Sequence, residues 1–412
     1  MAHGEVPIRI RGMFDVEQFL TGCDEPLRCK PRFREVIIIQ SCRASTPMVQ
    51  SSPERFILLD GIRGVAALFI VHRHAEQFFG RDDASSYLAV DLFFALSGFV
   101  LAHAYSMKLR EGAITPGFFM KARLARLYPL YGLGLALMAS YFICLYLLGL
   151  PTPIDDLHRH INPGELAIAL LTGLLFVPAP FTLTLNGALF LVSPAWSLFN
   201  ELVVNAVYGR WGVRATTKQT IVVLAVSACV LVVAAAEFGK LHAGFRWHEM
   251  YAGMGRVFFS FFAGVLVYRF RNRITELKPI QAALCLMLVC VILAVPISRE
   301  LRPFFDLAVV LLVWPTVLFV ASRIVPGRRV RILSTFLGTA SYAVYVLHIP
   351  LLAWTDFLMP AVDRENIALP VGVAFLIGTT CLSWYLTVHF DQPVQTWLKG
   401  RLRKRAGVGQ PV

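Results

Sequence analysis

Long apolar runs are the feature that most restricts the fold of this 412-residue chain. They lie at about 57–78, 87–107, 128–150, 164–178, 195–210, 219–238, 253–270, 280–297, 303–322, 334–354 and 368–390. Most approach the length of about 20 residues that an α-helix needs to cross a bilayer. The composition agrees, because 57 % of residues are hydrophobic and 16 % charged, against about 45–50 % and about 25 % in soluble domains. These runs predict an all-α, polytopic helical membrane bundle.

Basic residues decide the predicted topology. The net charge of +13 does not indicate nucleic-acid binding, since the aromatic residues lie inside the apolar runs rather than among the charges. Clusters of basic residues occur at 108–127, 210–218, 269–278, 323–331 and 399–405. A cytoplasmic N-terminus places all five clusters on the cytoplasmic side, as the positive-inside rule favours. We therefore expect a bacterial inner (cytoplasmic) membrane protein with both termini in the cytoplasm.

This topology holds only if residues 164–210 make one net crossing. The run at 164–178 is short and ends at Pro178, with Pro180 close behind, so we interpret it as a re-entrant or partial helix buried in protein. The sequence then predicts about ten transmembrane helices plus this partial helix.

The ends of the chain differ from its apolar centre. Residues 1–50 contain no run long enough for a span or a signal peptide, and we interpret them as a disordered segment or as untranslated sequence upstream of a start at Met48. Residues 51–397 form the predicted membrane domain, and 398–412 a basic cytoplasmic tail. The eight cysteines form no Cys-x-x-Cys pair, so no metal site is predicted.

Ionisable residues in the first apolar run indicate a functional site, because a charged group at bilayer depth costs several kcal/mol unless it faces protein or water. Arg63 and His74 are eleven residues apart, which leaves them about 20° apart around a helix and about 16 Å apart along it. This spacing suits a long ligand with an anionic end and a reactive end. Two alternatives stay open: Arg63 as a membrane anchor paired with Asp60, and His74 as an interfacial histidine.

Two further groups of polar residues occur at helical spacing. Arg123 and Arg126 are three residues apart on one face, where they can bind phosphate oxygens or simply form a topogenic basic cluster. Ser197 and Glu201 belong to a polar stripe in an apolar helix. Glu201 can pair with an arginine, orient a histidine or bind a sugar hydroxyl, or the stripe can hold helices together.

A third group lies near the C-terminal end. Ser341, Tyr345 and His348 share one face of a helix, and His348 lies toward the predicted outer end, as His74 does. The two histidines can converge there, or Tyr345 and His348 can be interface residues. Asp91 is the remaining deep carboxylate, and we interpret it as the counter-ion of an arginine.

Five segments of this chain resemble the acyltransferase-3 family of integral-membrane proteins. They read LDGIRGVAALFIVHRH, AVDLFFALSGFVLAHAY, KARLARLYPLY, PAWSLFNELVVNAVYG and GTASYAVYVLHIPLL. The similarity runs from about Phe56 to Trp397. It implies ten spans and transfer of an acyl group, usually acetyl, from cytoplasmic acyl-CoA to a hydroxyl of a carbohydrate or similar acceptor. The expected partners are acyl-CoA, a carbohydrate or lipid-linked sugar acceptor, and membrane lipid. Acyl-CoA would be a co-substrate, with no tightly bound cofactor.

The resemblance also implies roles for individual residues. The family's Arg-x10-His pair falls on Arg63 and His74, its Arg-x-x-Arg pair on Arg123 and Arg126, and its Trp-Ser-Leu-x-x-Glu motif on 196–201. We expect His74 and Glu201 to be catalytic, and the three arginines to bind the donor. The expected supporting residues are Asp60, Asp91, Trp196, Ser197, Ser341, Tyr345 and His348.

Two points stay open at this stage. Many family members carry Glu-Pro or Glu-x-Pro near the C-terminus, where this chain has HFDQPV with Asp391, so no role transfers to that carboxylate. The rival interpretation is a membrane transporter or flippase, in which Arg63, Glu201 and His74 form a substrate or proton pathway. It explains the buried charges but not the spacing of Arg63 and His74.

Overall fold

The computed structural model describes residues 56–80, 84–151, 162–180, 189–271, 280–359 and 364–406. They belong to one compact unit, residues 55–412. The segment 1–50, predicted to be disordered or untranslated, lies outside the described residues. Within the described ranges the regular structure is helical, and the sole β-type pairing is an isolated bridge between Ala84 and Pro296. The predicted all-α class is confirmed.

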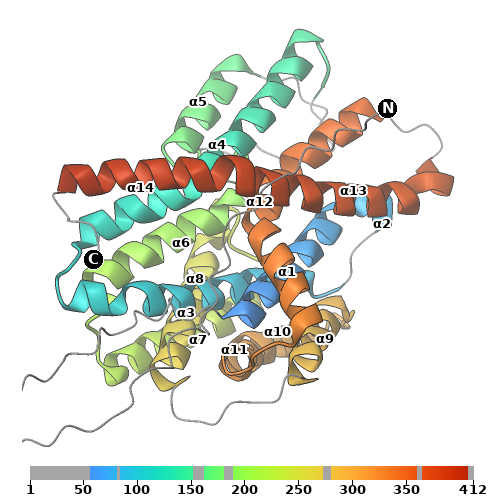
Figure 1. Cartoon of the computed structure of the whole chain (residues 1–412). Coiled ribbons are helices and arrows are strands. Elements are labelled where there is room, and N and C mark those ends of the chain that lie inside the picture. The colour runs from blue at the N-terminus through green and yellow to red at the C-terminus, as the bar shows by residue number, and fades with distance from the viewer. Residues whose placement is uncertain are drawn as a thin grey trace, which may run out of the picture. The chain divides into compact units, whose positions relative to one another are not determined.

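Each of the eleven apolar runs coincides with helical structure (Figure 1). The helices are α1 (Ile57–His74), α2 (Glu76–Phe79), α3 (Ala89–Arg110), α4 (Pro116–Leu147), α5 (Pro163–Leu174), α6 (Ala195–Val207), α7 (Thr217–Phe238), α8 (Met250–Phe270), α9 (Ile280–Ala294), α10 (Arg302–Ala308), α11 (Trp314–Ala321), α12 (Arg328–Leu358), α13 (Arg364–Leu386) and α14 (Gln392–Ala406). π-helical turns at Tyr208–Gly212, Val309–Val313 and Thr387–Asp391 extend α6, join α10 to α11 and join α13 to α14.

Fewer helices than predicted meet the requirements for crossing a membrane. In the described part of the chain, seven helical segments are long and apolar enough, so the predicted count of about ten is not confirmed. Helix α1 carries too many ionisable residues, and α5 and α9 are short. The 12 residues of α5 span about 18 Å at 1.5 Å per residue, against about 30 Å of hydrocarbon. The helix is therefore a partial one.

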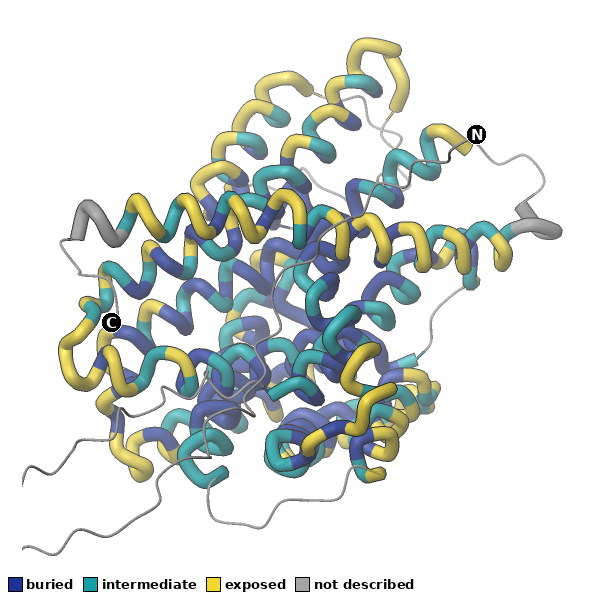
Figure 2. Tube along the Cα trace, in the orientation of Figure 1, coloured by how far each residue is buried: buried dark blue, intermediate teal, exposed yellow. Residues whose placement is uncertain are grey.

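The helices differ in what surrounds them. Figure 2 shows that α1, α3 and α8 lie largely in the interior, whereas α7 and the rod formed by α13 and α14 are exposed along much of their length. The exposed side chains of α7 are mostly aliphatic. Aliphatic side chains on the surface of a membrane protein contact lipid. Helix α7 and the rod of α13 and α14 therefore lie at the periphery of the bundle.

Glycines allow two pairs of central helices to touch at the backbone. Helix α3 packs on α8, where a Cβ at Gly98 would overlap the carbonyl oxygen of Phe261 and one at Gly264 would overlap that of Ala95. Helix α1 packs on α12 in the same way through Gly64. Small residues at such contacts are typical of membrane helices, where close van der Waals packing replaces the hydrophobic effect.

Helix α8 should therefore not tolerate a side chain at Gly264. We expect Gly264→Ala to lower the melting temperature of the detergent-solubilised protein, because overpacking against backbone costs at least about 1–3 kcal/mol. The control is Gly132→Ala on α4, whose added Cβ would lie 3.9 Å from the Tyr128 ring. Equal melting temperatures for Gly264→Ala and the native protein would contradict this packing.

Candidate active site

Two cavities lie along α1, one lined by residues of its first two turns and the other by residues of its C-terminal turn. The histidine cavity has a volume of about 660 Å³, and its walls include Arg73, His74, Trp196, His242 and Asp356. The arginine cavity, of about 400 Å³, is lined by polar residues that include Asp60, Arg63, Ser97, Arg123, Arg126, Ser197, Glu201, Ser341 and Tyr345. A pocket of about 40 Å³ lies between them and shares His74 and Trp196 with the first cavity, and Val90 and Tyr345 with the second.

Helix α4 delivers two cations to the arginine cavity. It begins at Pro116 after an N-cap by Thr115, whose side chain accepts a hydrogen bond from the Phe118 amide. Two turns later, Arg123 and Arg126 reach the cavity from the same face. Arg123 Nη2 lies 2.7 Å from Glu201 Oε1, and Arg126 Nη1 lies 3.2 Å from Asp391 Oδ2.

Glu201 pairs with an arginine in the arginine cavity. Its carboxylate accepts hydrogen bonds from Arg123 and, at 2.7 Å, from Ser97 Oγ, and it lines the arginine cavity rather than the histidine cavity. Of the alternatives open from sequence, the structure shows pairing with an arginine. These contacts make Glu201 the partner of Arg123, and its catalytic role stays a prediction.

Arg63 is also held in the arginine cavity. Its guanidinium donates to Asp60 Oδ1 at 2.8 Å, to Ser341 Oγ at 3.0 Å and to the Gly338 carbonyl at 3.2 Å. Arg63 and His74 line neighbouring cavities. The small pocket lies between these two cavities, alongside the part of α1 that separates Arg63 from His74.

His74 and His348 converge, from α1 and α12. His348 Nε2 lies 3.1 Å from His74 Nδ1, and each ring also has its Nδ1 3.0 Å from the carbonyl oxygen four residues earlier, Val344 for His348 and Ile70 for His74. A carbonyl oxygen only accepts, so both Nδ1 atoms carry the proton, an assignment made from the hydrogen-bond network. His348 Nε2 is then an acceptor, and the unprotonated nitrogen of a neutral His74 is Nε2.

Tyr345 separates the two cavities. Its hydroxyl lies 2.7 Å from Ser197 Oγ, which in turn donates to the Pro194 carbonyl at 2.9 Å. The Phe93 ring packs edge-on against Tyr345, with centroids 5.3 Å apart. The side chains of Tyr345 and Ser197 thus form a hydrogen-bonded constriction between α12 and α6.

A buried ionic network holds the loop 239–246 against the histidine cavity. Arg256 of α8 is 1 % exposed and donates to Asp91, with a shortest distance of 2.7 Å, and to the Ala243 carbonyl at 2.8 Å. Asp306 of α10, fully buried, accepts from the Leu241 amide and from Tyr87 Oη, both at 2.8 Å. Asp91 was predicted to be the counter-ion of an arginine, and that arginine is Arg256.

Sequence reasoning missed several residues that line the histidine cavity, and it gave no role to Asp391. Lys240 and His242 lie in a loop with no helical period, and Arg73 was passed over beside His74. Asp391 pairs with Arg126 because it lies in a π-helical turn, a local unwinding that periodicity does not predict. The signal available for Asp391 was its charge at the end of a long apolar run.

Comparison with known proteins identifies the family of this chain. A family model described as an acyltransferase domain (Acyl_transf_3) matches residues 56–388. The chain belongs to the acyltransferase-3 family. It is also 87 % identical over 191 residues to "Protein 2 in picA locus" of Rhizobium radiobacter, a match that covers 46 % of this chain and all of that protein. No solved structure matches the chain. Membership in the family and the apolar helices indicate an integral-membrane acyltransferase.

The Arg256–Asp91 pair should be essential to the fold of this acyltransferase-3 protein. We expect Arg256→Met or Asp91→Leu alone to destabilise it by about 3–5 kcal/mol, because each leaves a buried charge without its partner, whereas the double variant recovers part of the loss. Thermal unfolding in detergent measures this. Arg246→Met is the control, since its ion pair with Glu249 is 3.8 Å long and 45 % exposed on the arginine side. A double variant as unstable as the sum of the single ones would contradict the coupling.

Proposed function

We propose that this chain is a membrane O-acyltransferase that moves an acyl group from cytoplasmic acyl-CoA to a hydroxyl group of a carbohydrate-type acceptor. The observation that carries the proposal is the pair of neighbouring cavities, one lined by arginines and one by His74, with a narrow pocket between them. Membership in the acyltransferase-3 family favours this function over the transporter alternative.

The arginine cavity fits the donor. Coenzyme A is polyanionic, and Arg63, Arg123 and Arg126 present planar guanidinium groups that suit phosphate oxygens. Arg123 Nε is buried and has no hydrogen-bond partner among the described residues, so it is a donor available to a ligand. The predicted topology puts the beginnings of α1 and α4 on the cytoplasmic side, where acyl-CoA is found. Asp60, Glu201 and Asp391 then hold the guanidinium groups in position.

The donor must reach His74 through the constriction. The pantetheine arm is narrow and uncharged, which suits passage through a pocket that only Val90 and Tyr345 share with the arginine cavity. The pocket of about 40 Å³ is too small for the arm at rest. Rotation of the Tyr345 side chain, with loss of its hydrogen bond to Ser197, would open the path and bring the thioester to His74.

His74 is then the general base. Its Nε2 lone pair takes the proton of the acceptor hydroxyl as that oxygen attacks the thioester carbonyl carbon, which forms the C–O bond. Collapse of the tetrahedral intermediate breaks the C–S bond, and the CoA sulfur leaves with the proton returned by His74. His348 and the Ile70 carbonyl hold His74 Nδ1, so they keep the ring oriented and stabilise its protonated form.

Loss of His74 should stop the transfer. We expect His74→Gln to lower CoA release from acetyl-CoA by about 10²–10⁴-fold in membranes that contain the acceptor, because that is the usual contribution of a positioned general base. The matched control is His72→Gln, on the same helix, where the imidazole stacks on Phe79 and lines neither cavity. Wild-type turnover by His74→Gln would contradict the assignment. Labelled acetyl groups bound to His74 in the absence of acceptor would show a nucleophile instead of a base.

Donor affinity should depend on Arg123. We expect Arg123→Gln to raise the KM for acetyl-CoA about 10-fold or more, because a hydrogen bond to a charged group contributes about 1.5–3 kcal/mol. Lys121→Gln removes the same charge two residues away on the exposed face of α4 and should leave the KM unchanged. An unaltered KM in Arg123→Gln would remove the phosphate-binding role.

A further inference from the structure

The tetrahedral intermediate of acyl transfer carries a negative charge on the former carbonyl oxygen of the thioester. A hydrogen-bond donor already in place stabilises such an oxyanion. We propose that the hydroxyl group of Tyr345 is this donor, and that Tyr345 is a further catalytic residue next to His74. The inference rests on the proposed function, because it concerns the same transfer reaction. It gives the Tyr345 hydroxyl a role beyond closing the constriction.

Tyr345 lies where the path of the donor reaches the general base. His74 and Tyr345 both line the small pocket, and the residues that this pocket shares with the arginine cavity are Val90 and Tyr345. Among the described residues, Tyr345 is therefore the one side chain with a hydrogen-bond donor that borders both spaces. The pocket volume of about 40 Å³ is enough for a carbonyl group, since one water molecule needs about 10–15 Å³.

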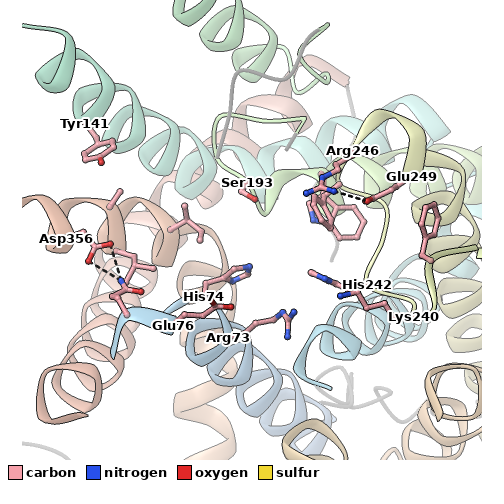
Figure 3. A pocket seen from close by; sticks show the side chains of 17 residues that line it. Arg73, His74, Glu76, Tyr141, Ser193, Lys240, His242, Arg246, Glu249 and Asp356 are labelled. Carbon is pink, nitrogen blue, oxygen red and sulfur yellow. Dashed lines mark hydrogen bonds and ion pairs between the residues drawn. The ribbon is translucent and has the colours of Figure 1, made fainter. Parts of the chain in front are cut away.

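The acceptor approaches from the other side. Figure 3 shows the His74 side chain directed into the open space of the histidine cavity, where the acceptor hydroxyl would lie. Tyr345 is not among the residues that line that cavity. A thioester carbonyl group in the small pocket would thus have the attacking oxygen on the side of the histidine cavity and the Tyr345 hydroxyl on the side of the arginine cavity.

The proton of the Tyr345 hydroxyl is bound to a weak acceptor. Ser197 uses its own proton on the Pro194 carbonyl at 2.9 Å, so Tyr345 is the donor in the 2.7 Å hydrogen bond between the two hydroxyl groups. An oxyanion can replace this neutral acceptor, because hydrogen bonds to a charged oxygen are about twice as strong as neutral ones. The bond strengthens only as the charge develops, so it favours the transition state over the bound thioester.

Other donors around the small pocket are bound to charged partners. Tyr87 Oη donates to the Asp306 carboxylate at 2.8 Å, and Arg256 donates to Asp91 at 2.7 Å. A change of partner there would leave a buried carboxylate without its hydrogen-bond donor, at a high cost in free energy. The acceptor of Tyr345 is uncharged, so Tyr345 can change partners during the reaction.

The bonds change in two stages. As the acceptor oxygen attacks, the C–O bond forms, His74 Nε2 takes the hydroxyl proton, and the π electrons of the carbonyl group move to its oxygen. Tyr345 donates a hydrogen bond to that oxygen and keeps its proton. When the intermediate collapses, the C=O bond forms again, the C–S bond breaks, and His74 returns the proton to the CoA sulfur. The Tyr345 hydroxyl then binds Ser197 again.

Removal of this hydroxyl group tests the role. We expect Tyr345→Phe to lower kcat for acceptor-dependent CoA release from acetyl-CoA by about 10²–10³-fold, with little change in the KM for acetyl-CoA, because the bond forms in the transition state. The matched control is Tyr131→Phe, which removes a buried hydroxyl that donates to the Gly173 carbonyl at 2.8 Å and borders neither cavity nor the small pocket. This control should keep kcat.

A donor with sulfur in place of the carbonyl oxygen separates this role from a structural one. Sulfur accepts hydrogen bonds weakly, so the preference for acetyl-CoA over its dithioester analogue acetyldithio-CoA should be about 10-fold or more greater in the native protein than in Tyr345→Phe. Equal loss of turnover with both donors would show a structural role. A native or higher kcat would show that the hydroxyl only closes the constriction. Either result overturns the proposal.

Failure of this inference differs from failure of the proposed function. Absence of acceptor-dependent CoA release by the native protein would contradict the transfer reaction and, with it, the oxyanion role. Native turnover combined with an unchanged kcat in Tyr345→Phe would overturn only the role of Tyr345, and the expected loss of turnover in His74→Gln would stand.

Discussion

Charge buried at membrane depth is the constraint on which the rest of this structure depends. Removing an ion from water costs several kcal/mol even after relaxation, so each buried cation needs a partner with close geometry. The chain provides them in pairs that join distant helices: Arg256 of α8 with Asp91 of α3, Arg123 of α4 with Glu201 of α6, and Arg126 of α4 with Asp391 beyond α13. These pairs specify which helices are neighbours, which apolar side chains alone do not in lipid.

The same pairs divide the interior by function. The Arg256–Asp91 pair is buried and Arg256 also binds the Ala243 carbonyl, so it supports the loop 239–246 at the histidine cavity. The pairs of Arg123 and Arg126 border a cavity, so these cations can also meet an anionic ligand. Tyr345 lies where the two regions meet. Family membership indicates an acyltransferase, and under the proposed function the two cavities would keep the donor phosphates and the reacting hydroxyl apart.

Some features of the structure could be predicted from the sequence and others could not. The sequence predicted the helical runs from their length and the shared face of Arg63 and His74 from helical geometry. It also predicted that Asp91 pairs with an arginine, because of the cost of a buried charge. The number of spans could not be predicted, because α1 uses its polar residues in cavities and α5 and α9 are short. The partner of Glu201 was left open among several, since a carboxylate in an apolar helix has several possible partners and periodicity does not choose among them.

By itself, the sequence determined that this chain is a helical membrane bundle, that one face of its first helix is polar and that it resembles the acyltransferase-3 family. The first two properties are local, because each depends on residues within a few helical turns, and the third rests on short motifs along the chain. Only the tertiary structure decided that His348 would orient His74, that the arginines and His74 would line separate cavities, and that Tyr345 would lie between these cavities. Such contacts join helices and loops far apart in sequence, and close packing together with hydrogen-bond satisfaction selects them.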